Sequence, residues 1–147
     1  NLKFNFYIHP KFKDYIKDFQ IGESDQIRLI PFGEEPLNEL MMTCRMLITD
    51  YSSVSWDVYY MNKPVLFYQF DLETYEEAHG SYMDMEKELF GDRVMNVEQL
   101  FDYIEEYVKR DFVPREQYTK LRPNYYKYVD NDNSKRIVEH IKKMDLD

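Results

Sequence analysis

Short apolar segments alternate with amphipathic segments along the first half of this 147-residue chain. The pattern predicts strands over residues 2–8, 27–30, 46–49 and 65–70, and helices over 12–19, 36–44 and 54–62. Such alternation with short connections is typical of a mostly parallel sheet with helices on both faces. We therefore expect an α/β, Rossmann-like fold in a single domain over residues 1–147.

The second half has a different pattern. Residues 71–92 are polar and aromatic without a clear period, which predicts a long functional loop with a turn or two of helix. Helices are predicted over 97–108, in part of 113–128, and over 137–144. The lone Cys44 lies on the apolar stripe of its predicted helix, so we expect a buried and unreactive thiol.

The charge balance excludes some partners. A formal net charge of -9 and the lack of a Lys/Arg cluster argue against nucleic acid and against direct binding to an anionic membrane. No run approaches the roughly twenty apolar residues of a membrane span, and no signal peptide is visible, so a cytoplasmic location is expected. The chain opens with Asn1 directly in a predicted strand, which suggests a piece of a longer polypeptide.

Two adjacent serines follow the third predicted strand and open the next helix. A helix N-terminus carries unpaired N–H groups and a partial positive charge, and serine hydroxyls add donors, so Ser52 and Ser53 predict an anion site. The alternative interpretation is that one of these serines only caps the helix.

Other polar residues also follow predicted strands. Because the carboxyl ends of parallel strands lie at one edge of a sheet, we expect these residues to form one rim. This arrangement alone predicts an anion or nucleotide binder. The residues are His9, Gly33, Glu34, Asp50, Tyr51, Ser52, Ser53, Asp71 and Glu73.

Residues 47–75 resemble the signature of the CDP-glycerol glycerophosphotransferase family, the bacterial enzymes that prime and polymerise teichoic acids. The similarity rests on the run LITDYSS, the pair Trp56-Asp57, the Lys63-Pro64 step into an apolar strand, and Phe70-Asp71-Leu72-Glu73. Weaker matches extend it over nearly the whole chain. They are His9, Gly80, Tyr82, Gly91 and the Asp130-Asn131 step.

This resemblance implies the donor-binding, C-terminal half of a GT-B-like transferase. The implied donor is CDP-glycerol or another CDP-alditol, with a polyol-phosphate or glycolipid acceptor held by an absent N-terminal half. It further implies that Ser52 and Ser53 bind the donor diphosphate and that His9 is catalytic, with His79 assisting. No cofactor is expected, and the spacing of Asp50, Asp57 and Asp71 does not demand a metal. Peripheral association with the inner face of the membrane is expected only of the full-length enzyme.

The segment Ala78-His79-Gly80 departs from the family, which usually shows Arg-Gly there. Arginine offers a permanent charge for phosphate, whereas histidine offers a weaker, pH-dependent donor. Two alternatives therefore stay open: a nucleotide-sugar glycosyltransferase for capsule or wall polysaccharide, and a non-catalytic docking domain. Local structural roles are the alternatives for single residues, namely backbone bonding for His9 and turn or helix capping for Asp50, Asp71 and Glu73.

Overall fold

The computed structural model describes residues 2–19, 22, 24–80, 83–85 and 87–144. It divides into two compact units, Asn1–Cys44 and Arg45–Asp147, which we call unit 1 and unit 2 and describe separately. Every strand pairing within the described residues is parallel, as the sequence predicts.

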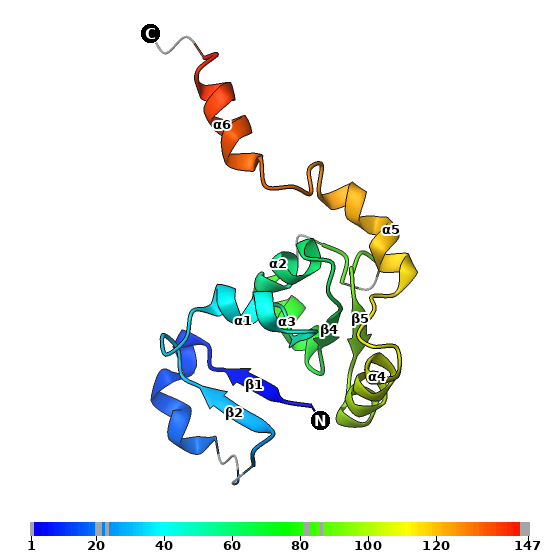
Figure 1. The fold of residues 1–147 in the computed structure, drawn as a ribbon. Coiled ribbons are helices and arrows are strands. Elements are labelled where there is room, and N and C mark those ends of the chain that lie inside the picture. The colour runs from blue at the N-terminus through cyan, green and yellow to red at the C-terminus, as the bar shows by residue number, and fades with distance from the viewer. Residues whose placement is uncertain (1, 20–21, 23, 81–82, 86, 145–147) are drawn as a thin grey trace. The chain divides into compact units, whose positions relative to one another are not determined.

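Unit 1 is built on two parallel strands, β1 (Phe4–Tyr7) and β2 (Ile27–Ile30), which pair from Phe4 opposite Ile27 to Tyr7 opposite Ile30 (Figure 1). The helix η1 (Pro10–Asp18) connects them, and α1 (Leu37–Thr43) follows β2. The predicted positions are therefore confirmed. However, η1 is a 3-10 helix, and Cys44 lies after α1 and is only half-buried, so its expected full burial is wrong.

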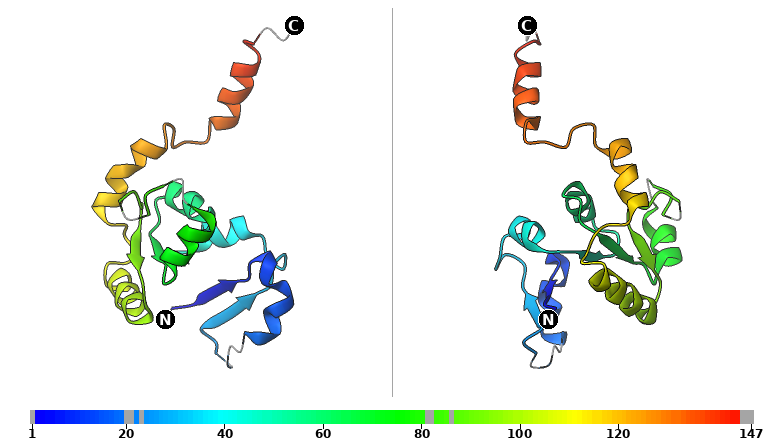
Figure 2. Two further views of the ribbon diagram at one scale, coloured as in Figure 1. Left: turned by 180° about the vertical axis from the view of Figure 1, so that it is seen from behind. Right: turned by 45° about the vertical axis from the view of Figure 1, so that its right-hand side comes forward.

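Unit 2 contains a three-stranded parallel sheet in the order β3-β4-β5. Its strands are β3 (Leu47–Thr49), β4 (Val65–Tyr68) and β5 (Asp92–Val94). A helix follows each strand, and Figures 1 and 2 show these helices packed around the sheet: α2 (Val54–Tyr60), α3 (Leu72–His79) and α4 (Val97–Lys109). The chain ends with α5 (Glu116–Tyr125) and α6 (Asn133–Ile141).

The core of unit 2 forms around the central strand β4. Val65, Leu66 and Phe67 are all buried because helices pack on the sheet and the strands β3 and β5 pair with the two edges of β4. On α2 the buried residues are Ser55, Val58 and Tyr59. Helical periodicity would also bury Val54 and Met61, but both are only half-buried. Trp56 packs against Phe90 with 4.2 Å between the ring centroids.

The region 71–92 is more ordered than its sequence suggests. It contains the eight-residue helix α3 and ends at β5, an edge strand that the sequence pattern missed. Gly91 explains how β5 approaches β4, since a Cβ atom at this position would lie 2.2 Å from the carbonyl oxygen of Val65. Only glycine permits this backbone contact.

A buried carboxylate joins β5 to the following helices. Asp92 is 6% exposed and accepts hydrogen bonds from the Tyr107 hydroxyl at 2.5 Å, the Tyr118 hydroxyl at 2.9 Å and Arg115 Nε at 2.9 Å. Arg115 also contacts Glu106 on α4 at 2.6 Å. The buried charge is therefore paired and hydrogen-bonded, which is the condition for tolerating it.

Candidate functional site

The loop after β3 carries the two serines that the sequence singles out. Ser53 precedes α2 in the N-cap position, but its side chain makes no capping hydrogen bond, and the hydroxyl of Ser55 donates to the carbonyl of Ser52 at 2.8 Å. Within the described part of the chain, the hydroxyls of Ser52 and Ser53 have no hydrogen-bond partner. The capping interpretation is therefore wrong for their side chains, and both hydroxyls remain available.

Tyr51 fixes this loop against α3. Its hydroxyl donates a 2.9 Å hydrogen bond to Asp71, and its ring stacks on Tyr75 with centroids 3.5 Å apart and planes 7° apart. Burial, the hydrogen bond and the nearby carboxylates raise the pKa of Tyr51 above its ordinary range, so the hydroxyl stays protonated and keeps donating. The loop after β3 is thus held by the segment that follows β4.

His79 extends the same stack by one ring. It is the last residue of α3, it is exposed, and its imidazole lies parallel to Tyr75 at 4.8 Å and 19°. Gly80 ends the helix with a φ of 68°, a conformation that favours glycine. Ser81 and Tyr82, which complete the divergent segment, lie outside the described residues.

The remaining acidic residues of the predicted rim are exposed. Asp50 accepts a 2.6 Å bond from the backbone N–H of Tyr51, which supports its local turn role. Asp71 occupies the N-cap position of α3, but its carboxylate bonds Tyr51 instead of capping the helix. Glu73 lies in the first turn of α3, where its charge is favourable to the helix dipole.

A cavity of about 130 Å³ opens beside this loop. Asp50, Tyr51, Ser52 and Ser53 line one side, and buried or half-buried aromatic and methionine side chains line the rest. Apart from Trp56, which belongs to the Trp56-Asp57 pair, no sequence motif marks these other lining residues. They include Trp56, Phe67, Gln69, Met83, Met85 and Phe90.

Three predicted rim residues belong to unit 1. His9 follows β1, is exposed, and accepts a 3.2 Å hydrogen bond at Nδ1 from the backbone N–H of Lys11. This bond is the local role considered for His9, and it leaves Nε2 to carry the proton of the neutral ring. Gly33, with a φ of 88°, and Glu34 form the turn after β2. The convergence of these residues with the serine loop of unit 2 stays a prediction.

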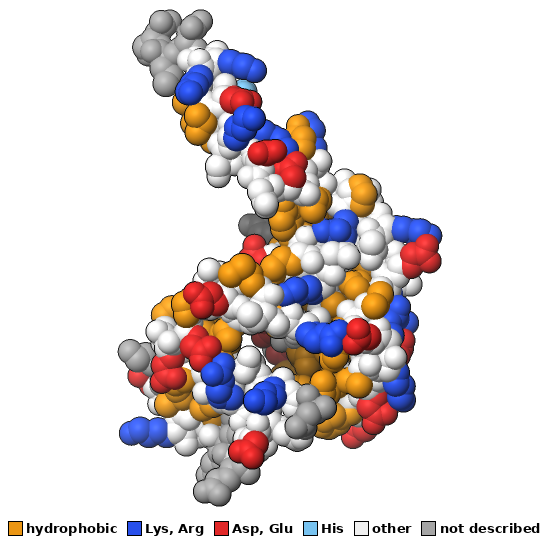
Figure 3. All heavy atoms as spheres, in the orientation of Figure 1, with side chains coloured by type: hydrophobic (Ala, Val, Ile, Leu, Met, Phe, Trp, Pro, Cys, Tyr) orange, Lys and Arg blue, Asp and Glu red, His pale blue; other side chains and the backbone are white. Residues whose placement is uncertain are grey.

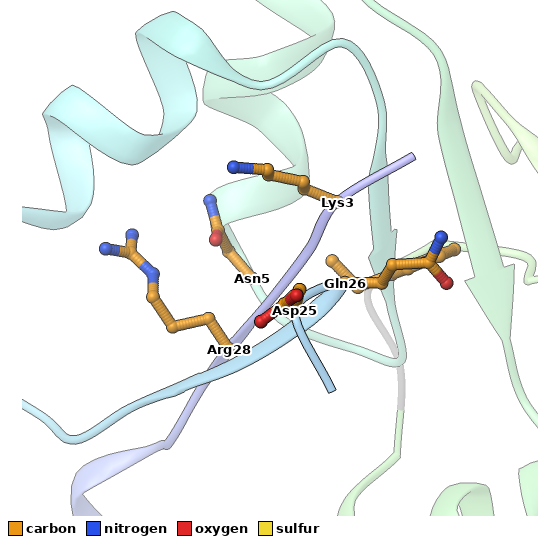
Figure 4. A pocket seen from close by; sticks show the side chains of 6 residues that line it. Lys3, Asn5, Asp25, Gln26 and Arg28 are labelled. Atoms are coloured by element: carbon orange, nitrogen blue, oxygen red, sulfur yellow. The ribbon is translucent and has the colours of Figure 1, made fainter. Parts of the chain in front are cut away.

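A second cavity, of about 350 Å³, lies at the other end of the strands of unit 1. Figure 4 shows Lys3, Asn5 and Arg28 extending to one side of the strands and Gln26 to the other. Arg28 is already paired with Glu35 at 2.7 Å. Lys3 and Gln26 precede β1 and β2, so this cavity is at the amino end of the strands, away from His9 and Gly33.

Acidic and basic side chains are interspersed on the face shown in Figure 3. In the described ranges, no group of three or more His, Cys, Asp or Glu side chains is placed to hold a metal ion. The helices described are also too short or too polar to cross a membrane.

Comparison with known proteins places this arrangement in a family. The family model for CDP-glycerol:poly(glycerophosphate) glycerophosphotransferase matches residues 1–143. The minor teichoic acid biosynthesis protein GgaB of Bacillus subtilis (strain 168) is 30% identical over 145 residues, 99% of this chain and 16% of GgaB. The teichoic acid glycerol-phosphate transferase of Staphylococcus aureus (strain NCTC 8325 / PS 47) is 32% identical, covering 86% of this chain and 33% of the relative.

The fold has a counterpart among solved structures. The wall teichoic acid polymerase TagF aligns over 96% of this chain and 34% of its own length, with a TM-score of 0.67 and 23% identity. This likeness confirms the predicted α/β, GT-B-like fold class. The chain spans about a third or less of the length of these relatives. By the match over residues 1–143, it belongs to the CDP-glycerol:poly(glycerophosphate) glycerophosphotransferase family.

Proposed function

We propose that this chain is the donor-binding half of a longer glycerophosphotransferase and that it binds CDP-glycerol or a related CDP-alditol. The family match over residues 1–143 is the observation that carries the proposal. The available serine hydroxyls beside a cavity support a place for the donor phosphates. The acceptor, a polyol phosphate or glycolipid, would be bound by the other half of the enzyme. The full-length enzyme would associate peripherally with the inner face of the membrane.

The proposed reaction is a phosphoryl transfer to a hydroxyl. The acceptor oxygen attacks the phosphorus next to the alditol, a new P–O bond forms, and the bond to the bridging oxygen breaks. CMP leaves with that electron pair, and the proton of the acceptor hydroxyl passes to a base outside this chain. The tasks of the protein are positioning of the donor and stabilisation of phosphate charge.

Ser52 and Ser53 are proposed to hold the diphosphate. Their hydroxyls are donors without another partner in the described structure, and the first backbone N–H groups of α2 lie beside them. Among the described residues that line the same cavity there is no lysine or arginine. Neutral donors would therefore carry most of the phosphate recognition here, so we expect the chain alone to bind its donor weakly.

His9 is proposed to assist the leaving group, and His79 to support the donor phosphates. For His9 the supporting observation is its Nδ1 bond to Lys11, because the opposite ring nitrogen then presents an N–H outward. Such a donor can stabilise charge on departing CMP. For His79, its exposure at the end of the Tyr51–Tyr75 stack supports the assignment.

Ligand binding to the 147-residue chain tests the proposal directly. In an NMR titration, CDP-glycerol and CMP should shift the amide signals of Asp50, Ser52, Ser53 and His9, while signals near His140 on α6 serve as the internal control. A stronger response to UDP-glucose than to CDP-glycerol would favour a sugar transferase. Shifts confined to the region of His140, or no response at millimolar donor, would reject the donor-binding assignment.

A further inference from the structure

Gln69 carries a buried side-chain amide. It directly follows β4, is 0% exposed, and lines the cavity beside the serine loop. No hydrogen-bond donor among the described residues reaches its Oε1 atom. Leaving a buried polar atom unpaired is energetically costly, so such an atom in a folded protein requires an explanation.

The opposite end of the amide fixes its orientation. Gln69 Nε2 donates to the carbonyl oxygen of Asp50 at 3.4 Å and to the Met85 sulfur at 3.9 Å. Exchanging oxygen and nitrogen would place two carbonyl oxygens against each other, which disfavours the flipped amide. Oε1 therefore stays an acceptor, and only a group with an N–H or O–H can satisfy it.

The surroundings of Gln69 Oε1 limit which kind of group can donate a hydrogen bond to it. The cavity volume of about 130 Å³ is close to that of four water molecules, at roughly 30 Å³ each, so it admits a small polar fragment. The serine loop lines this cavity too. Phosphate oxygens at neutral pH are acceptors and cannot donate to Oε1. A hydroxyl of the donor that lies next to the phosphates can satisfy Oε1, because it carries a proton to donate.

We infer that Gln69 Oε1 accepts a hydrogen bond from a donor hydroxyl that flanks the diphosphate, either on the ribose or on the alditol. The inference rests on the proposed function. Met83 and Met85 are half-buried and line the same cavity, and their flexible thioethers can shift to admit the hydroxyl.

The test compares ligands with and without the hydroxyls. Gln69→Met keeps the side-chain length and removes the acceptor, and Gln117→Met on the exposed face of α5 is the matched control. By NMR titration, Gln69→Met should weaken CDP-glycerol binding about tenfold, the value of one hydrogen bond near 1.4 kcal/mol. Inorganic pyrophosphate should bind the variant and the parent equally.

CDP distinguishes the two hydroxyl sources because it lacks the alditol. A tenfold loss that persists with CDP assigns the ribose hydroxyl, and a loss that disappears with CDP assigns the alditol. Equal affinity of the parent and Gln69→Met for CDP-glycerol would overturn the inference. An equal loss for pyrophosphate would also overturn it, because Gln69 would then only support the loop through Asp50.

Ligand analogues keep the inference testable if Gln69→Met does not fold. For the parent protein, CDP-glycerol is compared with CDP, and CDP with 2′-deoxy-CDP and 3′-deoxy-CDP. At least one missing hydroxyl should weaken binding about tenfold; if every pair agrees within twofold, the inference is wrong. A parent that binds none of these nucleotides would instead remove the proposed function itself.

Discussion

The hydroxyl of Tyr107 on α4 donates a 2.5 Å hydrogen bond to the carboxylate of Asp92 on β5. Because Arg115 and Tyr118 bond the same carboxylate, one buried side chain connects the edge strand to α4 and α5. The strand itself has only three residues, so this side-chain network contributes much of what holds it in place.

Asp92→Asn should destabilise unit 2 by about 2–3 kcal/mol. The substitution removes the buried one of the two carboxylates that pair with Arg115 and places an amide N–H₂ among hydrogen-bond donors. Trp56 is the only tryptophan and belongs to unit 2, so urea unfolding followed by its fluorescence measures the change. Asp102→Asn, an exposed change on α4, should alter the unfolding free energy by less than about 0.5 kcal/mol. Equal effects of the two variants would contradict this role of Asp92.

Alkaline pH should lower the free energy of unfolding of unit 2 because of its buried tyrosines. Burial, followed by the hydrogen bond and charge of Asp92, raises the pKa of Tyr107 above its ordinary value, and the same causes act on Tyr118. Burial raises the pKa of Tyr59 to about 12. The unfolded chain loses these protons near pH 10 while the folded protein retains them.

The stabilisation from each raised pKa is therefore complete below about pH 10 and declines as pH rises towards the folded-state pKa. The urea midpoint should fall between pH 9 and pH 11, and Tyr107→Phe should reduce the slope of that fall. Tyr103→Phe, on a half-buried tyrosine of α4 that does not bond Asp92, is the comparison. A parental slope in Tyr107→Phe would show that this tyrosine does not contribute.

Gly91→Ala should disrupt the pairing of β5 with β4. The added Cβ would lie 2.2 Å from the Val65 carbonyl oxygen, and the backbone of both strands must move to relieve this overlap. We expect a loss of about 3 kcal/mol or more in the free energy of unfolding. Gly22→Ala is the matched control, since a Cβ there meets no atom within 4 Å. Similar melting temperatures for the two variants would show that β5 does not depend on this contact.

Replacing both serines of the loop should reduce the transfer activity without lowering the stability. Neither hydroxyl caps α2, so Ser52→Ala with Ser53→Ala should change the melting temperature little. Loss of two phosphate donors should reduce transfer by the longer enzyme proposed above at least tenfold, as judged by CMP release. Ser134→Ala, in the first turn of α6, should leave both quantities unchanged. A drop in stability that matches the drop in activity would instead indicate a structural role.

His79 should make donor binding depend on pH if it acts on the phosphates. Imidazole loses its positive charge across neutral pH, so CDP-glycerol affinity should fall from pH 6 to pH 8. His79→Arg should flatten this fall and tighten binding, because a guanidinium stays charged. His79→Gln controls for titration of His9 and of the ligand. If His79→Gln keeps the parental affinity and pH profile, His79 only extends the stack on Tyr75.

The sequence predicted those parts of the fold that depend on local patterns. The run Val65–Tyr68 is apolar throughout, as a strand covered on both faces must be, and it appears as β4. Two of the three residues of β5 are charged, and Asp92 is tolerated there only because distant tyrosines and an arginine surround it. No short sequence window contains that information.

The same distinction applies to the site. Ser52 and Ser53 could be predicted because a strand end, two hydroxyls and a helix start are adjacent in sequence. Gln69 could not be predicted, since the orientation of its amide depends on contacts of Nε2 with Asp50, nineteen residues earlier, and with the Met85 sulfur. Tyr75 could not be predicted either, because only the structure shows that its ring stacks on the ring of Tyr51.

The contacts of Tyr51 have an evolutionary consequence. Its ring and hydroxyl bind two different positions of the segment after β4, Tyr75 and Asp71, so a change at any of the three removes a partner from another. Correlated substitutions are therefore expected at positions 51, 71 and 75 among relatives. In relatives with Phe at position 51, the carboxylate at position 71 loses its hydrogen-bond donor, so the residue type at 71 should vary. An aromatic residue at position 75 should be kept, because the ring stack remains.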